Sequence, residues 1–371
     1  MTNAKPAPKP DHEAILATAD AQAQSPFFSL LPAELRQLIY IETWRDPAGD
    51  GTLRQHITRR RPIESGNDTN SSRSSGLAHA ACITDPAALD LRYFKFQRAD
   101  PGSLEKAAWL QRLKTDWSLH WACEEALIDR TAVARELSAR DARKQKHATP
   151  FLPVLTTCKR MYLEALPSLY QNTTFIFNDT AEAAEFLAMY TPSPSSPSSS
   201  PITLRSIEMY MRASNLLTEL YYPYAEMAAP GVDSSEGPSP IYVGAGAGRL
   251  SMANNPWARA CESLARQPDL RSLYVWFDTR DLRAWWKRVS ETNLFARLRE
   301  VHVKDRRRFI LALPTLPEHT AAEWMPFGLP PHHFLVGDEL EGAPFVVVRG
   351  ERPNNWRVHM GDRFGDMFLR A

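Results

Sequence analysis

Histidine and cysteine are the residue types in this sequence that could bind a metal ion or attack a substrate. His120 and Cys123 stand three residues apart, which would place both side chains on one face of a helix. Two ligands do not make a zinc site, and the four cysteines of the chain are scattered, with no pair at metal-ligand spacing. His332 and His333 are adjacent, so they cannot point the same way from a helix or a strand. We therefore predict no metal site, and we expect His120 and Cys123 to have a packing role.

Motifs for phosphate binding and nucleophilic catalysis are missing as well. Gly244 and Gly246 are spaced like the start of a dinucleotide-binding loop, but Arg249 stands where the third glycine belongs. The chain contains neither a GxxxxGK[ST] phosphate loop nor a G-x-S-x-G elbow. We therefore predict no catalytic residue, no cofactor and no enzymatic activity. An enzyme whose pocket is built from dispersed residues remains an alternative.

Composition and charge limit the classes of partner. The 371 residues include 44 basic and 43 acidic side chains, so no whole-chain field would attract nucleic acid or an anionic membrane. No apolar run of about 18 residues predicts a membrane span, and the first residues lack the apolar core of a signal peptide. Scattered cysteines are typical of reduced thiols, which indicates the cytoplasm or the nucleus.

The stretch from residue 152 to residue 177 shows the clearest passage from a helix pattern to a strand pattern. Apolar side chains recur there at spacings of three and four, as on one face of a helix, at Leu155, Cys158, Tyr162, Ala165 and Leu169. Pro167 is expected to end or bend this helix. The β-branched and aromatic residues 173–177 then predict a short strand.

A second helix is predicted near the front of the chain. Pro32 suits a first helical position, and Glu34 suits the positive end of the helix dipole. One face of this helix is apolar and consists of Leu31, Leu35, Leu38 and Ile39. That face either packs within the chain, against residues 158–169, or is taken in part by a helix of a partner protein.

A pattern of the form L-R-[S/E]-apolar-x-apolar occurs three times in the second half of the chain, beginning at Leu204, Leu270 and Leu298. Each copy alternates like a strand, and helical patterns at residues 257–267 and 280–289 separate the strands. This order predicts a parallel sheet with helices on one side. Chance recurrence in a chain rich in leucine and arginine is the alternative.

Aromatic residues of the second copy suggest a binding surface. Tyr274 and Trp276 alternate with the apolar residues of that strand, so they lie on the opposite face of the predicted sheet. If that face is open, these two residues and His302 would line it. Farther on, residues 344–349 and 356–360 predict a hairpin that closes the sheet edge.

Two segments of the chain match a longer known pattern. Residues 31–40 read LPAELRQLIY, and residues 158–177 read CKRMYLEALPSLYQNTTFIF. Together they resemble a large fungal group of F-box-like proteins, mostly of unknown function. The resemblance implies that the leading helix packs on the linker subunit of a cullin–RING ubiquitin ligase while a downstream repeat domain holds a substrate. By position, this interface would contain Leu31, Pro32, Leu35, Leu38 and Ile39.

The expected fold is mixed α/β, with an F-box-like helical N-terminal part followed by a short leucine-rich-repeat-like β-α sheet. The predicted parts are a disordered leader at 1–24, an F-box-like region at 25–177 with an insertion at 46–150, and a β-α domain at 178–371 with flexible loops at 191–201 and 228–255. We expect a non-enzymatic protein–protein interaction module, which the resemblance makes a substrate adaptor of a ubiquitin ligase. A scaffold whose F-box-like segment binds no ligase is the alternative. The sequence does not define the oligomeric state.

Overall fold

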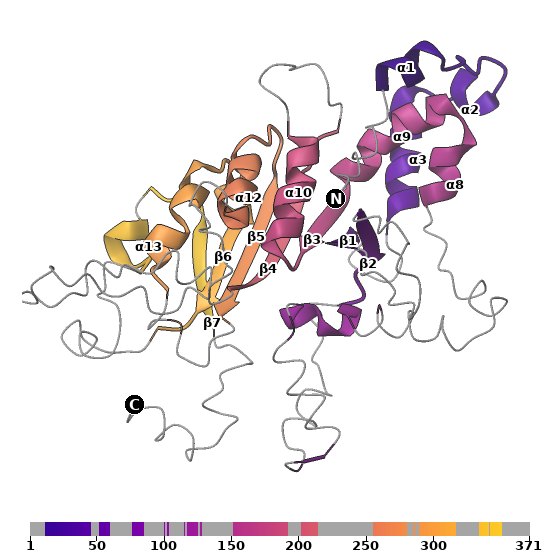
Figure 1. Cartoon of the computed structure of the whole chain (residues 1–371). Coiled ribbons are helices and arrows are strands. Elements are labelled where there is room, and N and C mark those ends of the chain that lie inside the picture. The colour runs from indigo at the N-terminus through magenta and orange to yellow at the C-terminus, as the bar shows by residue number, and fades with distance from the viewer. Residues whose placement is uncertain are drawn as a thin grey trace, which may run out of the picture.

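A seven-stranded sheet forms the centre of the molecule (Figure 1). The computed structural model describes residues 12–45, 52–59, 76–84, 100, 102–103, 115, 117–124, 127, 151–191, 202–213, 255–279, 285, 289–316, 334–340 and 342–350. The strands are β1 (Leu53–Arg59), β2 (Leu77–Ala81), β3 (Thr173–Phe177), β4 (Ser206–Ala213), β5 (Ser272–Thr279), β6 (Phe309–Pro314) and β7 (Val346–Gly350). The strand order is β2-β1-β3-β4-β5-β6-β7.

The sheet is parallel except at one edge, where β2 pairs antiparallel with β1. From β3 to β7 each strand lies beside its neighbour in the sequence. In register, Ile207 of β4 faces Phe175 of β3 and Leu273 of β5. The predicted mixed α/β fold with a parallel sheet is therefore confirmed.

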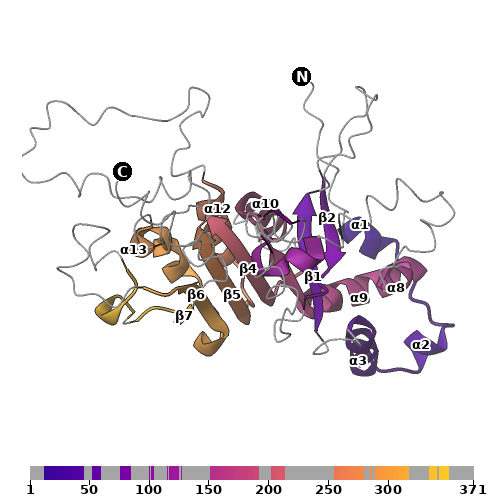
Figure 2. The same ribbon diagram turned by 90° about the horizontal axis from the view of Figure 1, so that it is seen from below.

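Helices α10 (Thr180–Tyr190) and α12 (Pro256–Ala265) cover one face of the sheet (Figures 1 and 2). Each begins at a polar cap, because the side chain of Asp179 accepts hydrogen bonds from two backbone N–H groups and that of Asn255 accepts one. Between the helices and the sheet lies the main core, which includes Phe177, Met209, Val275 and Leu311. Strand alternation directs these side chains to the helical face.

A helical head joins the sheet at the start of β3 (Figure 1). It consists of α1 (His12–Ala17), α2 (Pro26–Ser29), α3 (Ala33–Trp44), α8 (Phe151–Thr157) and α9 (Lys159–Gln171). A second core lies between α3, α8 and α9, built from Tyr40, Trp44, Phe151, Ala165 and Leu169. The front helix and the central helix thus pack against each other, but through Tyr40 and Trp44 and not through the predicted apolar face.

The central stretch differs from its prediction in two details. The single predicted helix is broken at Cys158, whose extended backbone starts α9 and whose sulfur accepts a hydrogen bond from the Met161 N–H. Pro167 does not end the helix, because α9 continues to Gln171. The strand predicted at residues 173–177 is confirmed as β3.

Two other expectations are wrong, and the predicted insertion contains a strand. The third copy of the recurring pattern forms no strand: Leu298 and Val301 are buried, but residues 296–300 form a 3-10 turn, and the strand beside β5 is β6. Residues 53–59 lie in the predicted insertion at 46–150, and they form β1 because β3 and β2 satisfy their backbone groups. Residues 12–24 carry α1 instead of a disordered leader, since α1 packs on α9.

The remaining elements are short, and several predictions lie outside the described residues. The short elements are η1 (Ser118–His120), α13 (Glu291–Leu294), η5 (Ala296–Glu300), η6 (Arg306–Arg308) and η8 (Gly337–Leu340). Most of the predicted loops and of the helix at 280–289 lie outside the described residues, as does the second half of the C-terminal hairpin. Its first half is β7, which pairs parallel with β6. No helix in the described part of the chain is long and apolar enough to cross a membrane.

Candidate functional site

Helix α3 presents different faces to the molecule and to its surroundings. Arg36, Tyr40 and Trp44, spaced four residues apart, are buried. Leu35, Leu38 and Ile39 are 46%, 59% and 42% exposed. These are apolar residues of the face that was predicted either to pack within the chain or to be taken in part by a partner helix. The structure therefore places most of the predicted apolar face on the outside of the helical head.

An ion pair fixes this orientation of α3. The guanidinium of Arg36 donates to both carboxylate oxygens of Glu164 on α9, at 2.8 and 3.0 Å, and to the Leu31 carbonyl at 2.6 Å. Arg160 donates to the same carboxylate at 3.3 Å, and its guanidinium lies over the Phe28 ring. The hydrogen bond to Glu164 raises the pKa of Arg36, while burial first and then the Glu164 charge raise that of Tyr40 to about 12.

The exposed residues of α3 line an open apolar groove of about 440 Å³. Leu31, Leu35, Leu38, Ile39 and Ile41 form its apolar part, and the charged residues Glu42 and Arg45 also line it. Pro32, at the start of α3, is exposed as well. An apolar centre beside a charged rim is the usual anatomy of a protein-binding surface. All five predicted interface residues of the front helix are thus near one another.

The predicted aromatic surface does not form a set with His302. Trp276 is 2% exposed and packs with Ile176, Tyr210 and Ala312 on the second face of the sheet. Tyr274 is half-buried beside them. His302 is exposed in an extended segment outside the strands. This sheet face is not open at Trp276, so Tyr274, Trp276 and His302 do not line a common binding surface.

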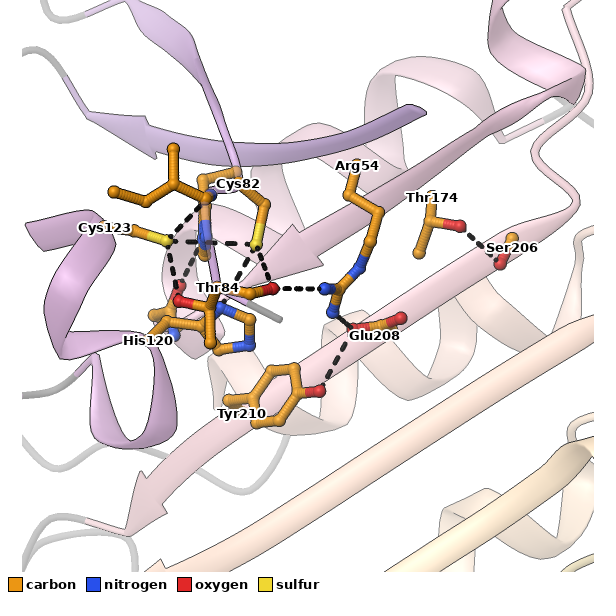
Figure 3. Close-up of polar contacts among 12 residues, drawn as sticks. Arg54, Cys82, Thr84, His120, Cys123, Thr174, Ser206, Glu208 and Tyr210 are labelled. Carbon is orange, nitrogen blue, oxygen red and sulfur yellow. Dashed lines mark hydrogen bonds and ion pairs between the residues drawn. The ribbon is translucent and has the colours of Figure 1, made fainter. Parts of the chain in front are cut away.

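The second face of the sheet instead holds a cluster of histidine and cysteine side chains, His56, Cys82, His120 and Cys123, which we term the His/Cys cluster. Figure 3 shows Cys82, His120 and Cys123. Their candidate ligand atoms all lie within 4.8 Å of one another. The two sulfurs are 3.8 Å apart, and the Cys82 sulfur lies 3.4 Å from His120 Nδ1. Both histidines and Cys123 are buried.

Three separate parts of the chain position the His/Cys cluster. His56 is on β1, with Ile176 as its partner on β3, and Cys82 follows the last residue of β2. His120 ends η1, and Cys123 lies in the helical residues 121–124 that come next. The His120 ring contacts the Tyr210 ring at a centroid distance of 4.2 Å, which seats this helical segment on β4. Strand pairing alone brings His56 and Cys82 together.

Hydrogen bonds from neighbouring residues fix the position of Cys123 in the His/Cys cluster. The Cys123 sulfur lies 3.3 Å from the Ile83 backbone N–H, which donates to it, and 3.0 Å from Thr84 Oγ1. Arg54 donates to the Thr84 carbonyl at 2.9 Å and to Glu208 at 2.6 Å (Figure 3). The Cys82 side chain, chiefly, and the two histidines lower the pKa of Cys123, and burial lowers that of His120.

Sequence reasoning found only the local half of this cluster. The helical spacing of His120 and Cys123 is visible in the sequence, but His120 and Cys82 are 38 residues apart and Cys82 and Cys123 are 41 apart. The missing signal is the pairing of β1 with β2, which lie within the predicted insertion at 46–150. The prediction that His120 and Cys123 are only two possible ligands is therefore incomplete, because the fold supplies two more.

The architecture defines a mixed α/β protein with a mostly parallel, sequentially ordered sheet and a helical head. The chain belongs to the family described as "Domain of unknown function (DUF7730)", whose model matches residues 112–325, more than half of the sequence. A search of curated proteins and a search of solved structures found no significant match. The matched residues contain His120, Cys123 and the strands β3 to β6, whereas α3, β1 and β2 precede them.

Proposed function

We propose that this protein is a non-enzymatic protein-interaction module that binds a helical partner through α3, as an F-box-like substrate adaptor of a ubiquitin ligase does. The observation that carries the proposal is the exposed apolar strip of Leu35, Leu38 and Ile39. A side chain of this size that is about half exposed contributes roughly 1 kcal/mol when a partner buries the rest of it. Three such residues on one helix face are a typical helix-binding surface.

The inner face of α3 supports the same proposal. Because Arg36 and Tyr40 hold the helix on α9 through Glu164, the outer strip keeps one orientation without a partner. Preorganisation of this kind lowers the entropic cost of association. Leu31, Leu35, Leu38 and Ile39 of the F-box-like segment are among the residues that line the groove, so the resemblance and the exposed surface overlap. A ligase partner of this class would act in the cytoplasm or the nucleus.

The sheet is the part that would hold a substrate under this proposal. Its sequential parallel order from β3 to β7 is the order of a repeat-like β-α domain, which supports the leucine-rich-repeat-like interpretation. The proposal includes no catalytic residue and no nucleic-acid or membrane partner.

Binding of the purified full-length chain to the purified ligase linker subunit tests the proposal. We expect a complex in calorimetry or surface-immobilised binding, and we expect Leu35→Asp to weaken it at least about tenfold, because a charge would be buried in the interface. Leu152→Asp is the matched control: Leu152 is 55% exposed on α8, away from the groove, and its variant should bind like the wild type.

Circular dichroism separates loss of binding from loss of folding. Leu35 is exposed, so the aspartate variant should melt within a few degrees of the wild type. Absence of binding by the wild-type chain, or equal affinity of Leu35→Asp and the wild type, would contradict the adaptor function. The first of these results would favour a scaffold that binds no ligase.

A further inference from the structure

The His/Cys cluster has the composition and spacing of a metal centre. In a tetrahedral site with Zn–S near 2.3 Å and Zn–N near 2.0 Å, sulfur–sulfur edges are about 3.8 Å and sulfur–nitrogen edges about 3.5 Å. The two sulfurs here are 3.8 Å apart, and Cys82 Sγ lies 3.4 Å from His120 Nδ1. A disulfide requires about 2.05 Å between sulfurs, so the two cysteines are not bonded to each other.

His56 carries an independent sign of a missing ligand. Its ring is fully buried, and Nδ1 lies 2.9 Å from the Asn178 side-chain oxygen. Asn178 in turn donates to the Trp117 carbonyl at 3.4 Å, which fixes the amide. The other ring nitrogen, Nε2, is buried and has no hydrogen-bond partner among the described residues. In metal-binding histidines, one ring nitrogen typically donates a hydrogen bond to an oxygen acceptor and the other binds the metal. The His56 ring has the same arrangement, with Nε2 available for a metal ion.

Charge balance also favours a divalent cation. Two thiolates and two neutral imidazoles carry two negative charges, which one divalent ion cancels. Burying an uncompensated charge costs several kcal/mol, so a neutral assembly suits a site where both histidines and Cys123 are buried. The Ile83 N–H that donates to the Cys123 sulfur is the kind of contact that stabilises a bound thiolate.

We propose that His56, Cys82, His120 and Cys123 bind one zinc ion as a structural centre. The two-sulfur, two-nitrogen ligand set in tetrahedral spacing selects zinc over the harder cations, which prefer oxygen. Four protein ligands leave no open position, so the ion has a structural role. It would join β1, the end of β2 and the helical residues 121–124, which cover the second face of the sheet.

This inference is independent of the α3 interface, and it has its own test. Full-length protein purified without chelators should contain about one zinc ion per chain by plasma mass spectrometry. Extended X-ray absorption fine structure at the zinc edge should show two sulfur neighbours at about 2.3 Å and two nitrogen neighbours at about 2.0 Å. Cobalt exchanged into the site should give the visible absorption of a tetrahedral thiolate complex.

Variants identify the ligands. Cys82→Ser should lower zinc affinity at least about tenfold in a competition with a coloured chelator. Cys158→Ser is the matched control, because Cys158 is a half-buried thiol that caps α9 outside the cluster, and this variant should keep its zinc. If Cys82→Ser fails to fold, removal of zinc from the wild-type chain still decides the matter: chelation should lower its melting temperature, and added zinc should restore it.

Several outcomes would overturn the inference. These are wild-type protein without zinc that takes up neither zinc nor cobalt, equal zinc content in Cys82→Ser and the wild type, or a Cys82–Cys123 disulfide in non-reducing peptide mass spectrometry of the freshly purified chain.

Discussion

Glu291 is a fully buried carboxylate whose two oxygens are both held by donors. One oxygen accepts from Trp285 Nε1 at 2.7 Å and from Arg349 at 3.0 Å, and the other accepts from the Leu335 N–H at 3.0 Å and from Arg349 at 2.6 Å. Arg349 is on β7, the last strand of the sheet. The carboxylate therefore fastens the edge strand to α13.

Glu291→Gln should lower the free energy of unfolding by about 3–5 kcal/mol, because it leaves the guanidinium of Arg349 without its charge partner. Urea unfolding followed by circular dichroism measures this change. Glu42→Gln is the control, since Glu42 pairs with Arg45 at the surface and should cost less than about 1 kcal/mol. A loss below about 1 kcal/mol for Glu291→Gln would show that the pair does not stabilise the edge strand.

The exposure and the contacts of individual side chains were harder to predict from the sequence than the helices and strands. The spacing of Leu35, Leu38 and Ile39 was visible in the sequence, but their exposure depends on Arg36, whose ion pair with Glu164 spans 128 positions. His56 lies in the segment predicted as an insertion, and only its pairing with β3 shows that this member of the His/Cys cluster is a strand residue. Contacts between distant residues leave no local pattern.

Ion pairs with one carboxylate connect the three copies of the L-R pattern, although only two of the copies form strands. Asp269, which precedes Leu270, pairs with Arg205 of the first copy at 2.7 Å and with Arg271 of the second at 3.4 Å. It also pairs with Lys304, directly after the third copy. The Lys304 ammonium foremost, and Arg205 after it, hold the pKa of Asp269 at about 2.

Asp269 should therefore stabilise the fold in a pH-dependent way. Its folded pKa is below the ordinary value of about 3.9, so the stabilisation is complete above that value and is lost as the pH falls toward 2. Asp269→Asn should lower the free energy of unfolding by about 1–2 kcal/mol at pH 7, allowing for partial solvent screening. Urea titrations of both proteins from pH 7 to pH 2 should show this difference shrinking toward zero.

The exposed Asp20 supplies a control for that series, because Asp20→Asn should change stability little at any pH. A difference between Asp269→Asn and the wild type that stays constant down to pH 2 would exclude the ion-paired carboxylate as its source.

Elements were predicted where a local pattern and the tertiary contacts agree. The strand at 173–177 and the helix at 257–267 follow from side-chain type and spacing alone. The third copy failed because the same alternating residues can be buried without a strand: Leu298 and Val301 reach the main core from a 3-10 turn. The sequence pattern thus predicts the burial of these two residues correctly but predicts a strand that does not form.

Among the described residues, the main core and the core of the helical head share one side chain. Tyr170, near the end of α9, packs against the core of the helical head and against the main core under α10. Its ring lies 5.4 Å from that of Phe175, and its hydroxyl is 2.8 Å from the Tyr190 hydroxyl. Only Asn172 separates α9 from β3. The head and the sheet should therefore unfold together.

Tyr170→Ala should uncouple the two parts, because it removes the ring that both cores contact and costs about 2–4 kcal/mol. Native-state hydrogen exchange measures this directly. In the wild type, slowly exchanging amides of α3 and β5 should report the same opening free energy. In the variant, α3 should open at a lower free energy than β5.

Tyr170→Phe is the control, because it keeps the ring and loses only the hydrogen bond to Tyr190. In this variant α3 and β5 should keep equal opening free energies, and the free energy of unfolding should fall by about 1 kcal/mol. Unequal opening of α3 and β5 already in the wild type would mean that the head is an independent folding unit and that Tyr170 is not the link between the two cores.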